Sequence, residues 1–166
     1  MSVAIPWLDR VLQRKEERAA LLDTPPWSDD FRWQELLALV EDCQVYKMVP
    51  GALICREGAM ESFLGVVLQG RLEVRKLDSE GVEKTIATLG AGRAFGEMSV
   101  IDAEPRSATL VASEPGLLLV LTGESFAALS ENHPRVALKL LQRIARTLSQ
   151  RLRHTSGQLA DYMQGS

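Results

Sequence analysis

The chain has few of the residues on which metal sites, disulfide frameworks and common catalytic constellations depend. Its 166 residues include two cysteines, Cys43 and Cys55, and two histidines, His133 and His154. The cysteines lie twelve positions apart without any further pattern, so we expect two reduced thiols in a core rather than a disulfide. No Ser-His-Asp or Cys-His arrangement has a suitable spacing. The sequence therefore predicts a protein that is not an enzyme and binds no metal.

Long apolar runs and an excess of positive charge are also missing. No apolar stretch approaches the ~20 residues that a membrane-spanning helix requires. The N-terminus lacks a basic segment followed by an apolar run, so we expect no signal peptide and predict a cytoplasmic location. The formal net charge of -3 argues against nucleic-acid binding by the chain as a whole. Hydrophobic and charged contents of 46% and 25% are typical of one globular domain.

The strongest chemical signal lies between Gly92 and Thr109. Gly92 and Gly96 allow the backbone to turn sharply on either side of Phe95. Glu97 begins a short run that predicts about one helical turn, whose free N–H groups attract an anion. Arg106 follows with a planar fork of donors that suits a phosphate. The segment thus combines an acidic acceptor, amide donors and a guanidinium.

Two short runs in this segment resemble a known motif. Phe95-Gly96-Glu97-Met98-Ser99, followed by Pro105-Arg106-Ser107-Ala108-Thr109, is similar to the phosphate-binding cassette of cyclic nucleotide-binding domains. That family carries Phe-Gly-Glu, a small residue two positions after the glutamate, and an arginine about nine positions after it. The spacing here resembles that of the regulatory subunit of cyclic-AMP-dependent protein kinase. The resemblance covers about residues 30–153, including Pro50-Gly51, Glu57-Gly58 and the run from Val66 to Gly70.

The resemblance implies which residues hold the ligand. Arg106 would bind the cyclic phosphate through two charge-assisted hydrogen bonds, each worth about 1.5–3 kcal/mol when water is excluded. Glu97 would accept a hydrogen bond from the ribose 2′-hydroxyl. The other implied contacts are the backbone of Gly96, the amides of Met98 and Ser99, and the side chain of Ser107, which favours cyclic AMP. The alternative is a surface salt bridge from Arg106 to Glu97, Asp102 or Glu104.

The base needs a partly apolar slot and a lid. Candidates for the slot are Ile86, Leu89 and Phe95, each of which can also be an ordinary core residue. We expect the lid to come from the long C-terminal helix. Alignment of His133-Pro134 with the start of that helix in the bacterial catabolite activator places Thr147, Leu148 and Arg151 near the base. Tyr162 is a further candidate cap.

Residues 43–122 have the pattern of a β domain. Short apolar runs alternate with turn residues, and glycines recur mostly at intervals of 11–12 residues. This spacing predicts a mainly β fold, a β-roll (double-stranded β-helix, jelly-roll-like) with flanking helices. The predicted strands are 45–49, 52–55, 63–68, 72–77, 85–89, 107–112 and 117–121, with a hairpin connection at 78–81. The run 117–121 is apolar throughout, which favours a strand covered on both faces.

Helices are predicted on both sides of the β-roll. The N-terminal ones are 6–22 and 29–41, the second capped by Ser28. The C-terminal ones are 123–130 and a long helix from Pro134 to His154 or beyond, which Gly157 ends or frays. The predicted layout is an N-terminal helical extension 1–27, a binding domain 28–156 (β-roll 43–122, C-terminal helices 123–156) and a mobile tail 157–166. Whether helix 6–22 packs on its own domain or docks a partner stays open.

The sequence therefore predicts a sensor of a cyclic nucleotide, cyclic AMP first, with cyclic GMP or cyclic di-GMP as alternatives. It would signal to an unidentified effector protein by moving its C-terminal helix, or through a homodimer along residues 134–154, whose apolar residues recur every four positions. Too few residues follow His154 for a helix-turn-helix, so DNA binding is not expected. Two other classes remain: an interaction module with a vestigial pocket, and an enzyme on a similar β-roll such as a cupin, which needs a histidine cluster.

Overall fold

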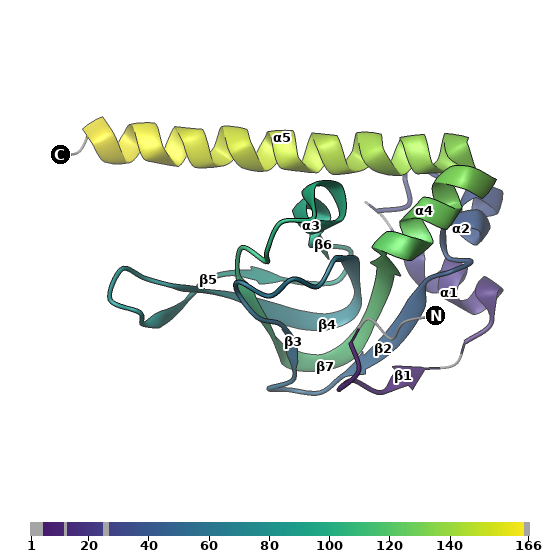
Figure 1. Cartoon of the computed structure of the whole chain (residues 1–166), viewed down its shortest axis with the longest axis horizontal. Helices are drawn as coiled ribbons and strands as arrows, with labels where there is room; N and C mark the ends of the chain where they lie inside the picture. Colours follow the sequence, from purple (N-terminus) through teal and green to yellow (C-terminus); the bar gives the residue numbers. More distant parts are fainter. Residues whose placement is uncertain (1–4, 12, 25–26, 165–166) are drawn as a thin grey trace.

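The computed structural model describes residues 5–11, 13–24 and 27–164. Its centre is an antiparallel sheet that curls into a roll, with helices from both ends of the chain on one side (Figure 1). The strands are β1 (Arg10–Val11), β2 (Gln44–Met48), β3 (Leu53–Cys55), β4 (Phe63–Leu77), β5 (Glu83–Leu89), β6 (Ala94–Phe95) and β7 (Thr109–Thr122). The helices are α1 (Lys15–Leu22), α2 (Trp33–Leu39), α3 (Glu97–Asp102), α4 (Gly123–Asn132) and α5 (Pro134–Gln164). The mainly β fold with flanking helices is confirmed.

The two longest strands, β4 and β7, form the middle of the sheet. The strand order is β1-β2-β7-β4-β5, with β3 also paired to β7 and β6 to β4. Each long strand merges two runs that the sequence predicted as separate, because both bend without breaking at Gly70 and Gly116. A Cβ at Gly70 would lie 2.6 Å from the Pro115 carbonyl oxygen, so only glycine allows the two backbones to approach this closely.

The predicted hairpin connection at 78–81 is confirmed between β4 and β5. The Asp78 carboxylate accepts hydrogen bonds from the amides of Glu80 and Val82, both at 2.9 Å. Gly81 takes the left-handed conformation, with φ of 78°, that an L side chain rarely adopts. A side chain bonded to its own turn and a glycine at the strained position make this connection readable from sequence alone.

The core has two parts on opposite faces of β7, and the alternation of the strand assigns residues to each. Leu119 and Leu121 pack with the helices, while Leu118 and Val120 fill the interior of the roll. All four are buried, as expected for a run that is apolar at every position. The helical layer therefore rests directly on the strand that closes the roll.

The N-terminal helix prediction is wrong for residues 6–11, 13 and 14. Ile5 is fully buried inside the roll, and Arg10 and Val11 form β1 against β2. Pairing with the sheet thus overrides the helical periodicity, and α1 begins only at Lys15. Leu12 belongs to the predicted helix 6–22 and lies outside the described residues. The second helix is also shorter than predicted and begins after Arg32, not after Ser28.

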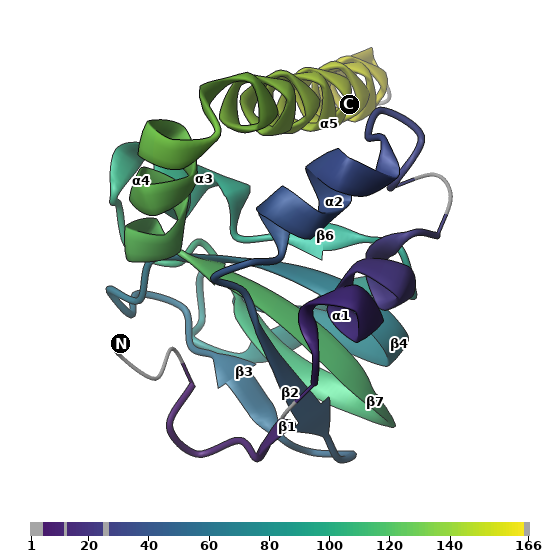
Figure 2. The ribbon, with the colours of Figure 1, turned by 90° about the vertical axis from the view of Figure 1, so that its right-hand side faces the viewer.

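The C-terminal helices lie across the open side of the roll (Figures 1 and 2). Thr122 caps α4 by accepting a hydrogen bond from the Ser125 amide at 3.1 Å. The expectation that Gly157 ends the long helix is wrong, because α5 continues for 31 residues to Gln164. A glycine in an exposed helix interior costs only about 1 kcal/mol, which does not suffice to break it.

Cys43 and Cys55 are both free and buried, as predicted. Burial raises the pKa of the Cys43 thiol to about 12. Among the described residues, no helix combines the length and apolar character needed to cross a membrane. The same residues contain no cluster of three or more histidine, cysteine or acidic side chains that would hold a metal ion.

Candidate functional site

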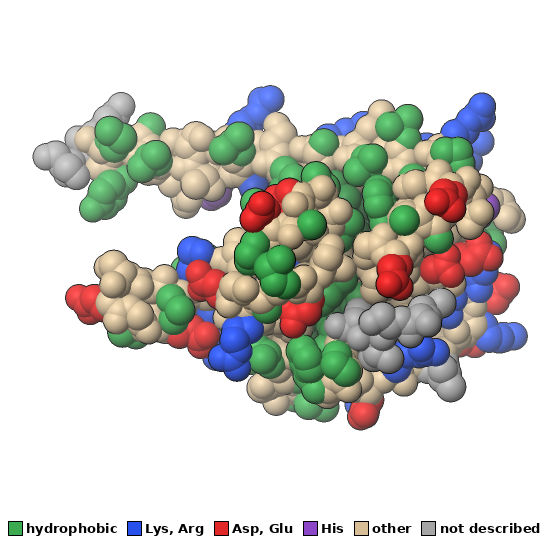
Figure 3. Space-filling view, viewed as in Figure 1, with side chains coloured by type: hydrophobic (Ala, Val, Ile, Leu, Met, Phe, Trp, Pro, Cys, Tyr) green, Lys and Arg blue, Asp and Glu red, His purple; other side chains and the backbone are tan. Residues whose placement is uncertain are grey.

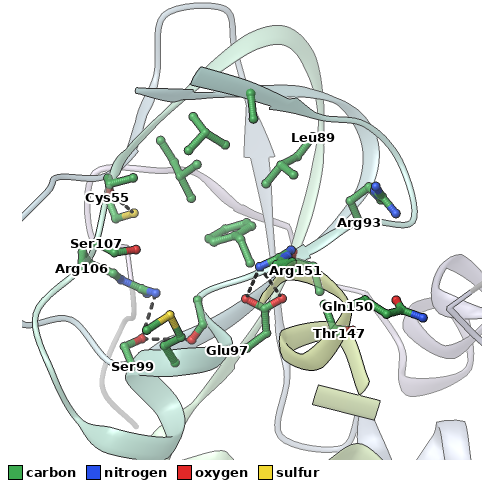
Figure 4. Close-up of a pocket in the computed structure, with 18 of the residues that line it drawn as sticks. Cys55, Leu89, Arg93, Glu97, Ser99, Arg106, Ser107, Thr147, Gln150 and Arg151 are labelled. Carbon is green, nitrogen blue, oxygen red and sulfur yellow. Dashed lines mark hydrogen bonds and ion pairs between the residues drawn. The ribbon is translucent and has the colours of Figure 1, made fainter. Parts of the chain in front are cut away.

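A cavity of about 900 Å³ lies between the roll and α5. Its walls come from β4 and β5, from the segment 92–108, and from α5. Figure 4 shows Cys55, Ser107 and Arg106 on one side of it and Arg93 and Gln150 on the other. All six predicted ligand contacts therefore belong to one concave site. These six are Gly96, Glu97, Met98, Ser99, Arg106 and Ser107, all of which line the cavity.

The guanidinium of Arg106 is buried, with 5% of the residue exposed. Its Nη1 donates to Oγ of Ser99 at 2.9 Å, and its Nη2 donates to the carbonyl oxygen of Phe63 at 2.9 Å. The guanidinium carbon lies 4.1 Å from the centroid of the Phe63 ring, a cation–π contact. Arg106 is therefore not the surface salt bridge that was the alternative to a ligand contact.

Backbone bonds hold Arg106 in this position. Its amide donates to the carbonyl oxygen of Ala59 at 2.8 Å, and its own carbonyl accepts from the Gly58 amide at 2.8 Å. The loop that follows β3 therefore fixes the arginine from one side, and α3 fixes it from the other. An arginine tied at both backbone and side chain is held ready to meet an anion at little entropic cost.

Glycine is required at position 96. Gly96 adopts φ of 77° and precedes the first residue of α3. A Cβ there would lie 2.3 Å from Nη1 of Arg106 and 2.4 Å from the Phe63 carbonyl oxygen. The short side chain of Ser99 lies against the same guanidinium. Its Oγ donates to the Gly96 carbonyl at 3.0 Å and accepts from Nη1 of Arg106. The Phe-Gly-Glu-x-Ser run thus forms the pocket around the guanidinium.

Glu97 faces α5. The residue is 2% exposed and contacts Arg151, whose Nη1 lies 3.0 Å from Oε1 and donates to Oε2 at 3.1 Å. Nη2 of Arg151 donates to the carbonyl oxygen of Ala94 at 2.9 Å. Figure 4 shows the guanidinium of Arg151 directly over the carboxylate. An ion pair therefore connects the cassette to the C-terminal helix.

Two buried polar atoms of this site lack a directed hydrogen bond. They are Nε of Arg106, a donor, and Oε1 of Glu97, an acceptor. Unpaired buried polar atoms are rare and costly in folded proteins, and they call for an explanation at each position. One guanidinium donor and one carboxylate acceptor are the complement of a ligand that carries an anionic group and a hydroxyl.

The surroundings of Arg106 are dry and contain other ionisable groups. Burial lowers the pKa of Arg106. The charges of Cys55, Glu61 and Glu97 act in the opposite direction and raise this pKa. Burial also raises the pKa of the Cys55 thiol to about 11. The thiol lines the cavity but is protonated at neutral pH, so it is no nucleophile.

The residues predicted for the base slot and the lid divide into two groups. Leu89, Phe95, Thr147 and Arg151 line the cavity, although Phe95 also packs in the core against Phe63. Ile86 and Leu148 are not among the lining residues, and this part of the prediction needs correction. Ile86 is 61% exposed, and the residues of β5 that line the cavity are Ala87, Thr88 and Leu89. Leu148 instead packs against the helical core.

Tyr162, the further candidate cap, is not among the lining residues either. It lies in the last turns of α5, and the residue is 76% exposed. The helix reaches the cavity earlier, with Thr147, Gln150, Arg151 and His154. The part of α5 that lines the cavity is therefore its middle.

Sequence reasoning missed a contribution from the N-terminal region, which we call the N-terminal clasp (Trp27, Asp30 and Glu35). Trp27 and Asp30 line the cavity although they precede the roll by many residues. The clasp pairs with basic side chains on one face of α5. Its contacts are Lys139 Nζ to Glu35 Oε2 at 2.7 Å, Arg143 Nη1 to Asp30 Oδ2 at 3.1 Å, Arg146 Nη1 to Asp30 Oδ1 at 3.3 Å, and the Arg143 guanidinium 4.9 Å from the Trp27 ring centroid.

Comparison with known families gives one match that covers more than half of the chain. The cyclic nucleotide-binding domain matches residues 45–133. The cyclic AMP receptor protein of Thermus thermophilus is 39% identical over 98 residues, which are 59% of this chain and 45% of that protein. A cyclic nucleotide-gated potassium channel of Rhizobium etli is 38% identical over 92 residues, 55% of this chain and 24% of the channel. This chain thus spans less than half the length of these two relatives.

Solved structures with the same fold include a cyclic nucleotide-binding domain from Methylobacillus flagellatus. Its TM-score is 0.80 at 31% identity, covering 92% of this chain and 88% of that one. The catabolite activator protein of Thermus thermophilus has a TM-score of 0.67 at 34% identity, covering 76% of this chain and 57% of that one. Both comparisons agree with the β-roll that the glycine spacing predicted.

Proposed function

Because this chain belongs to the cyclic nucleotide-binding domain family, we propose that its cavity binds a cyclic ribonucleotide, cyclic AMP in the first place. The observation that carries the proposal is the pairing of two incomplete groups in one cavity. Arg106 keeps a buried donor without a partner, and Glu97 keeps a buried acceptor without a directed one. A cyclic phosphate and a ribose hydroxyl would complete both.

The phosphate half of the site depends on Arg106. Its present acceptors, the Ser99 hydroxyl and the Phe63 carbonyl, are neutral. A phosphate that replaces them gains charge-assisted bonds, which are roughly twice as strong as neutral ones. The first amides of α3, those of Met98 and Ser99 among them, have no acceptor within the helix and add donors on the same side.

The base lies between an apolar wall and the helix. Val74, Ala87 and Leu89 supply the wall from β4 and β5, and Thr147 and Gln150 face them from α5. Ser107 lies at the phosphate end, and its backbone oxygen already accepts a hydrogen bond from Lys76 at 2.6 Å. The hydroxyl of Ser107 is therefore the group that would contact the ligand and favour cyclic AMP. Cyclic GMP and cyclic di-GMP are the alternative ligands.

The protein acts as a sensor rather than an enzyme, and α5 is its output. Arg151 connects the cassette directly to this helix, so a ligand that alters the surroundings of Glu97 alters how α5 is held. The ligand's difference in binding free energy between the two arrangements of the helix then sets how far their populations shift. The effector would be a protein that contacts α5.

A second copy of this chain is one partner that α5 fits. The stripe expected to form a dimer seam is Val136, Leu140, Ile144, Leu148 and Leu152; its first four residues pack in or against the helical core, whereas Leu152 is 68% exposed. A seven-residue repeat without a charged residue shares Leu148 and Leu152 with this stripe and continues along the helix: Leu138, Leu141, Ala145, Leu148, Leu152, Thr155, Leu159 and Tyr162. Such a repeat is typical of a two-stranded coiled coil. Light scattering of Leu152→Glu, which should convert a dimer to a monomer, tests this part; an unchanged mass with the variant contradicts it.

Calorimetric titration with cyclic AMP, cyclic GMP and cyclic di-GMP tests the binding proposal. We expect cyclic AMP to bind the wild type, and Arg106→Ala to weaken binding about 100-fold or more through loss of two charged hydrogen bonds. Arg71→Ala, at an exposed salt bridge with Glu114, is the matched control and should bind as the wild type. Circular dichroism confirms that each variant is folded, and Glu97→Gln provides a second test should Arg106→Ala unfold. No heat with any nucleotide would favour the vestigial pocket.

A further inference from the structure

The residue that follows Arg106 is held by a side chain from the last residues of β4. Nζ of Lys76 donates to the backbone oxygen of Ser107 at 2.6 Å and to Oε1 of Glu57 at 3.1 Å. Lys76 is not among the residues that line the cavity, whereas Arg106 and Ser107 both line it (Figure 4). The ammonium group therefore contacts the cassette without lining the space that a ligand would fill.

Glu57 joins the same contact to two further segments of the chain. Its Oε2 accepts from the Leu77 amide at 3.1 Å, and its own amide donates to Oγ1 of Thr109 at 3.0 Å. The amide of Leu77 and then the ammonium of Lys76 lower the pKa of Glu57, so its carboxylate is charged at neutral pH. The loop after β3, the end of β4 and the end of the cassette therefore meet at one ion pair.

The position of Lys76 on β4 relates the two ends of the cavity to each other. The register between β4 and β7 ends at the pair Arg75 and Thr109, and the ammonium of Lys76 extends this attachment by two residues, to Ser107. Lys76 also follows Val74 by two positions, so the two side chains stand on the same face of the strand. Val74 belongs to the apolar wall that faces the base. One strand therefore carries both this wall and the side chain that holds the phosphate end.

We propose that Lys76 is a positioning residue of the nucleotide site, which holds Arg106 and Ser107 at a fixed distance from the apolar wall. The inference rests on the proposed function, which it deepens by assigning the geometry of the phosphate end to a residue that does not touch the ligand. Backbone bonds to Gly58 and Ala59 hold Arg106 from one side, and Lys76 holds the next residue from the other. Without the ammonium, more of the ordering of this segment has to accompany binding, which lowers the affinity.

Amide exchange on the full chain without nucleotide tests the attachment itself. In Lys76→Met, which keeps an unbranched side chain without charge, we expect residues 106–109 to exchange faster than in the wild type. Lys84→Met is the matched control, since Lys84 pairs with Lys76 across the hairpin but bonds to Asp78, at 2.7 Å, and not to the cassette. It should leave this exchange unchanged. Equal protection of 106–109 in the wild type and Lys76→Met would overturn the proposal.

Calorimetric titration with cyclic AMP tests the effect on the site. The side chain of Lys76 is 47% exposed, so its replacement should leave the fold intact, which circular dichroism checks. We expect Lys76→Met to bind cyclic AMP about three- to tenfold more weakly than the wild type, because a partly exposed charged contact is lost. Lys84→Met should bind as the wild type. Equal affinities of the wild type and Lys76→Met would overturn the proposal.

The two phosphorothioate diastereomers of cyclic AMP separate positioning from a general loss of order. Each carries sulfur at a different exocyclic position of the phosphate, so the ratio of their Kd values reports how Arg106 and Ser107 meet these positions. We expect this ratio to move towards one by about twofold or more in Lys76→Met and to stay unchanged in Lys84→Met. An equal loss for both diastereomers would overturn the proposal. If no nucleotide binds the wild type, the proposed function fails, while exchange without ligand still decides whether Lys76 holds the cassette.

Discussion

The two halves of α5 have opposite surroundings although they form one unbroken helix. In the first half, Leu140 and Ile144 are buried against the roll, and the N-terminal clasp pairs with the basic side chains. In the second half, beyond Arg151, every residue from 152 to 163 is exposed. Figure 3 shows this half standing apart from the β4–β5 hairpin, with an open hollow between them.

The first half of α5 is packed on the rest of the protein, whereas the second half is exposed. Isolated helices of this length are marginal in water, so the second half depends on its continuity with the first and on whatever partner covers it. The ion pair of Arg151 with Glu97 lies where the two halves meet. The same substitution placed in each half should give different results.

The largest contrast is expected from leucine truncation. Leu140→Ala removes a fully buried side chain from the helical core and should lower the free energy of unfolding by about 2–5 kcal/mol. Leu159→Ala, at a residue that is 58% exposed, should change it by less than about 0.5 kcal/mol in the monomer. Denaturant unfolding followed by circular dichroism measures both. Similar losses at the two positions would mean that the second half packs on the body.

Glycine substitutions should act in opposite directions. Gly96→Ala places a Cβ against Nη1 of Arg106 in a left-handed backbone, so we expect a loss of about 1–3 kcal/mol and weaker nucleotide binding. Gly157→Ala meets nothing within 4 Å and should stabilise the second half by about 0.4–1 kcal/mol, seen as higher helicity. Thermal melts and titration with cyclic AMP check both. Unchanged binding in Gly96→Ala would argue against this geometry for the cassette.

Removal of the acid shared by two arginines should loosen only the first half. Asp30→Asn takes the charge from the partner of Arg143 and Arg146, and we expect a loss of about 1 kcal/mol and faster amide exchange in residues 139–146. Asp161→Asn in the exposed second half is the control and should alter neither quantity. An equal effect of the two variants would mean that the clasp contributes no stability.

The smallest effect concerns the pH dependence of one clasp pair. The amide of Arg32 and then the ammonium of Lys139 lower the pKa of Glu35 below 4.5. A lowered pKa stabilises the fold above the unfolded value and loses that stabilisation as the pH falls through the folded one. Glu35→Gln should therefore cost about 0.5 kcal/mol at neutral pH, and this cost should shrink as the pH falls below the usual pKa of a glutamate. Unfolding in urea at neutral and acidic pH measures this, and a pH-independent cost would rule out the ion pair as its source.

The parts predicted correctly from sequence are those whose geometry is local. Gly96, Ser99 and Arg106 meet within one short segment, and the hairpin at Asp78 bonds to its own turn. The β-roll could be predicted from the positions of the glycines, since the bends in β4 and β7 require glycine. At these positions the backbone conformation depends on residues that are close in the sequence.

The parts that sequence missed join distant segments. Glu97 and Arg151 are 54 positions apart, and Arg143 meets Asp30 over 113 positions. The resemblance to the catabolite activator placed Arg151 near the base but gave no acidic partner for it. β1 was read as helix because the sheet that it joins is formed by residues much later in the chain. No local pattern encodes such pairings.

Amide exchange of the full chain with and without saturating cyclic AMP tests the central claim most directly. The account predicts slower exchange in the cassette, residues 97–109, changed exchange in residues 147–154, where α5 lines the cavity, and no change in residues 134–142. The three segments are read in one experiment, so each serves as a reference for the others. Identical exchange in all three, with nucleotide in excess, would contradict the claim that this cavity senses a cyclic nucleotide through α5.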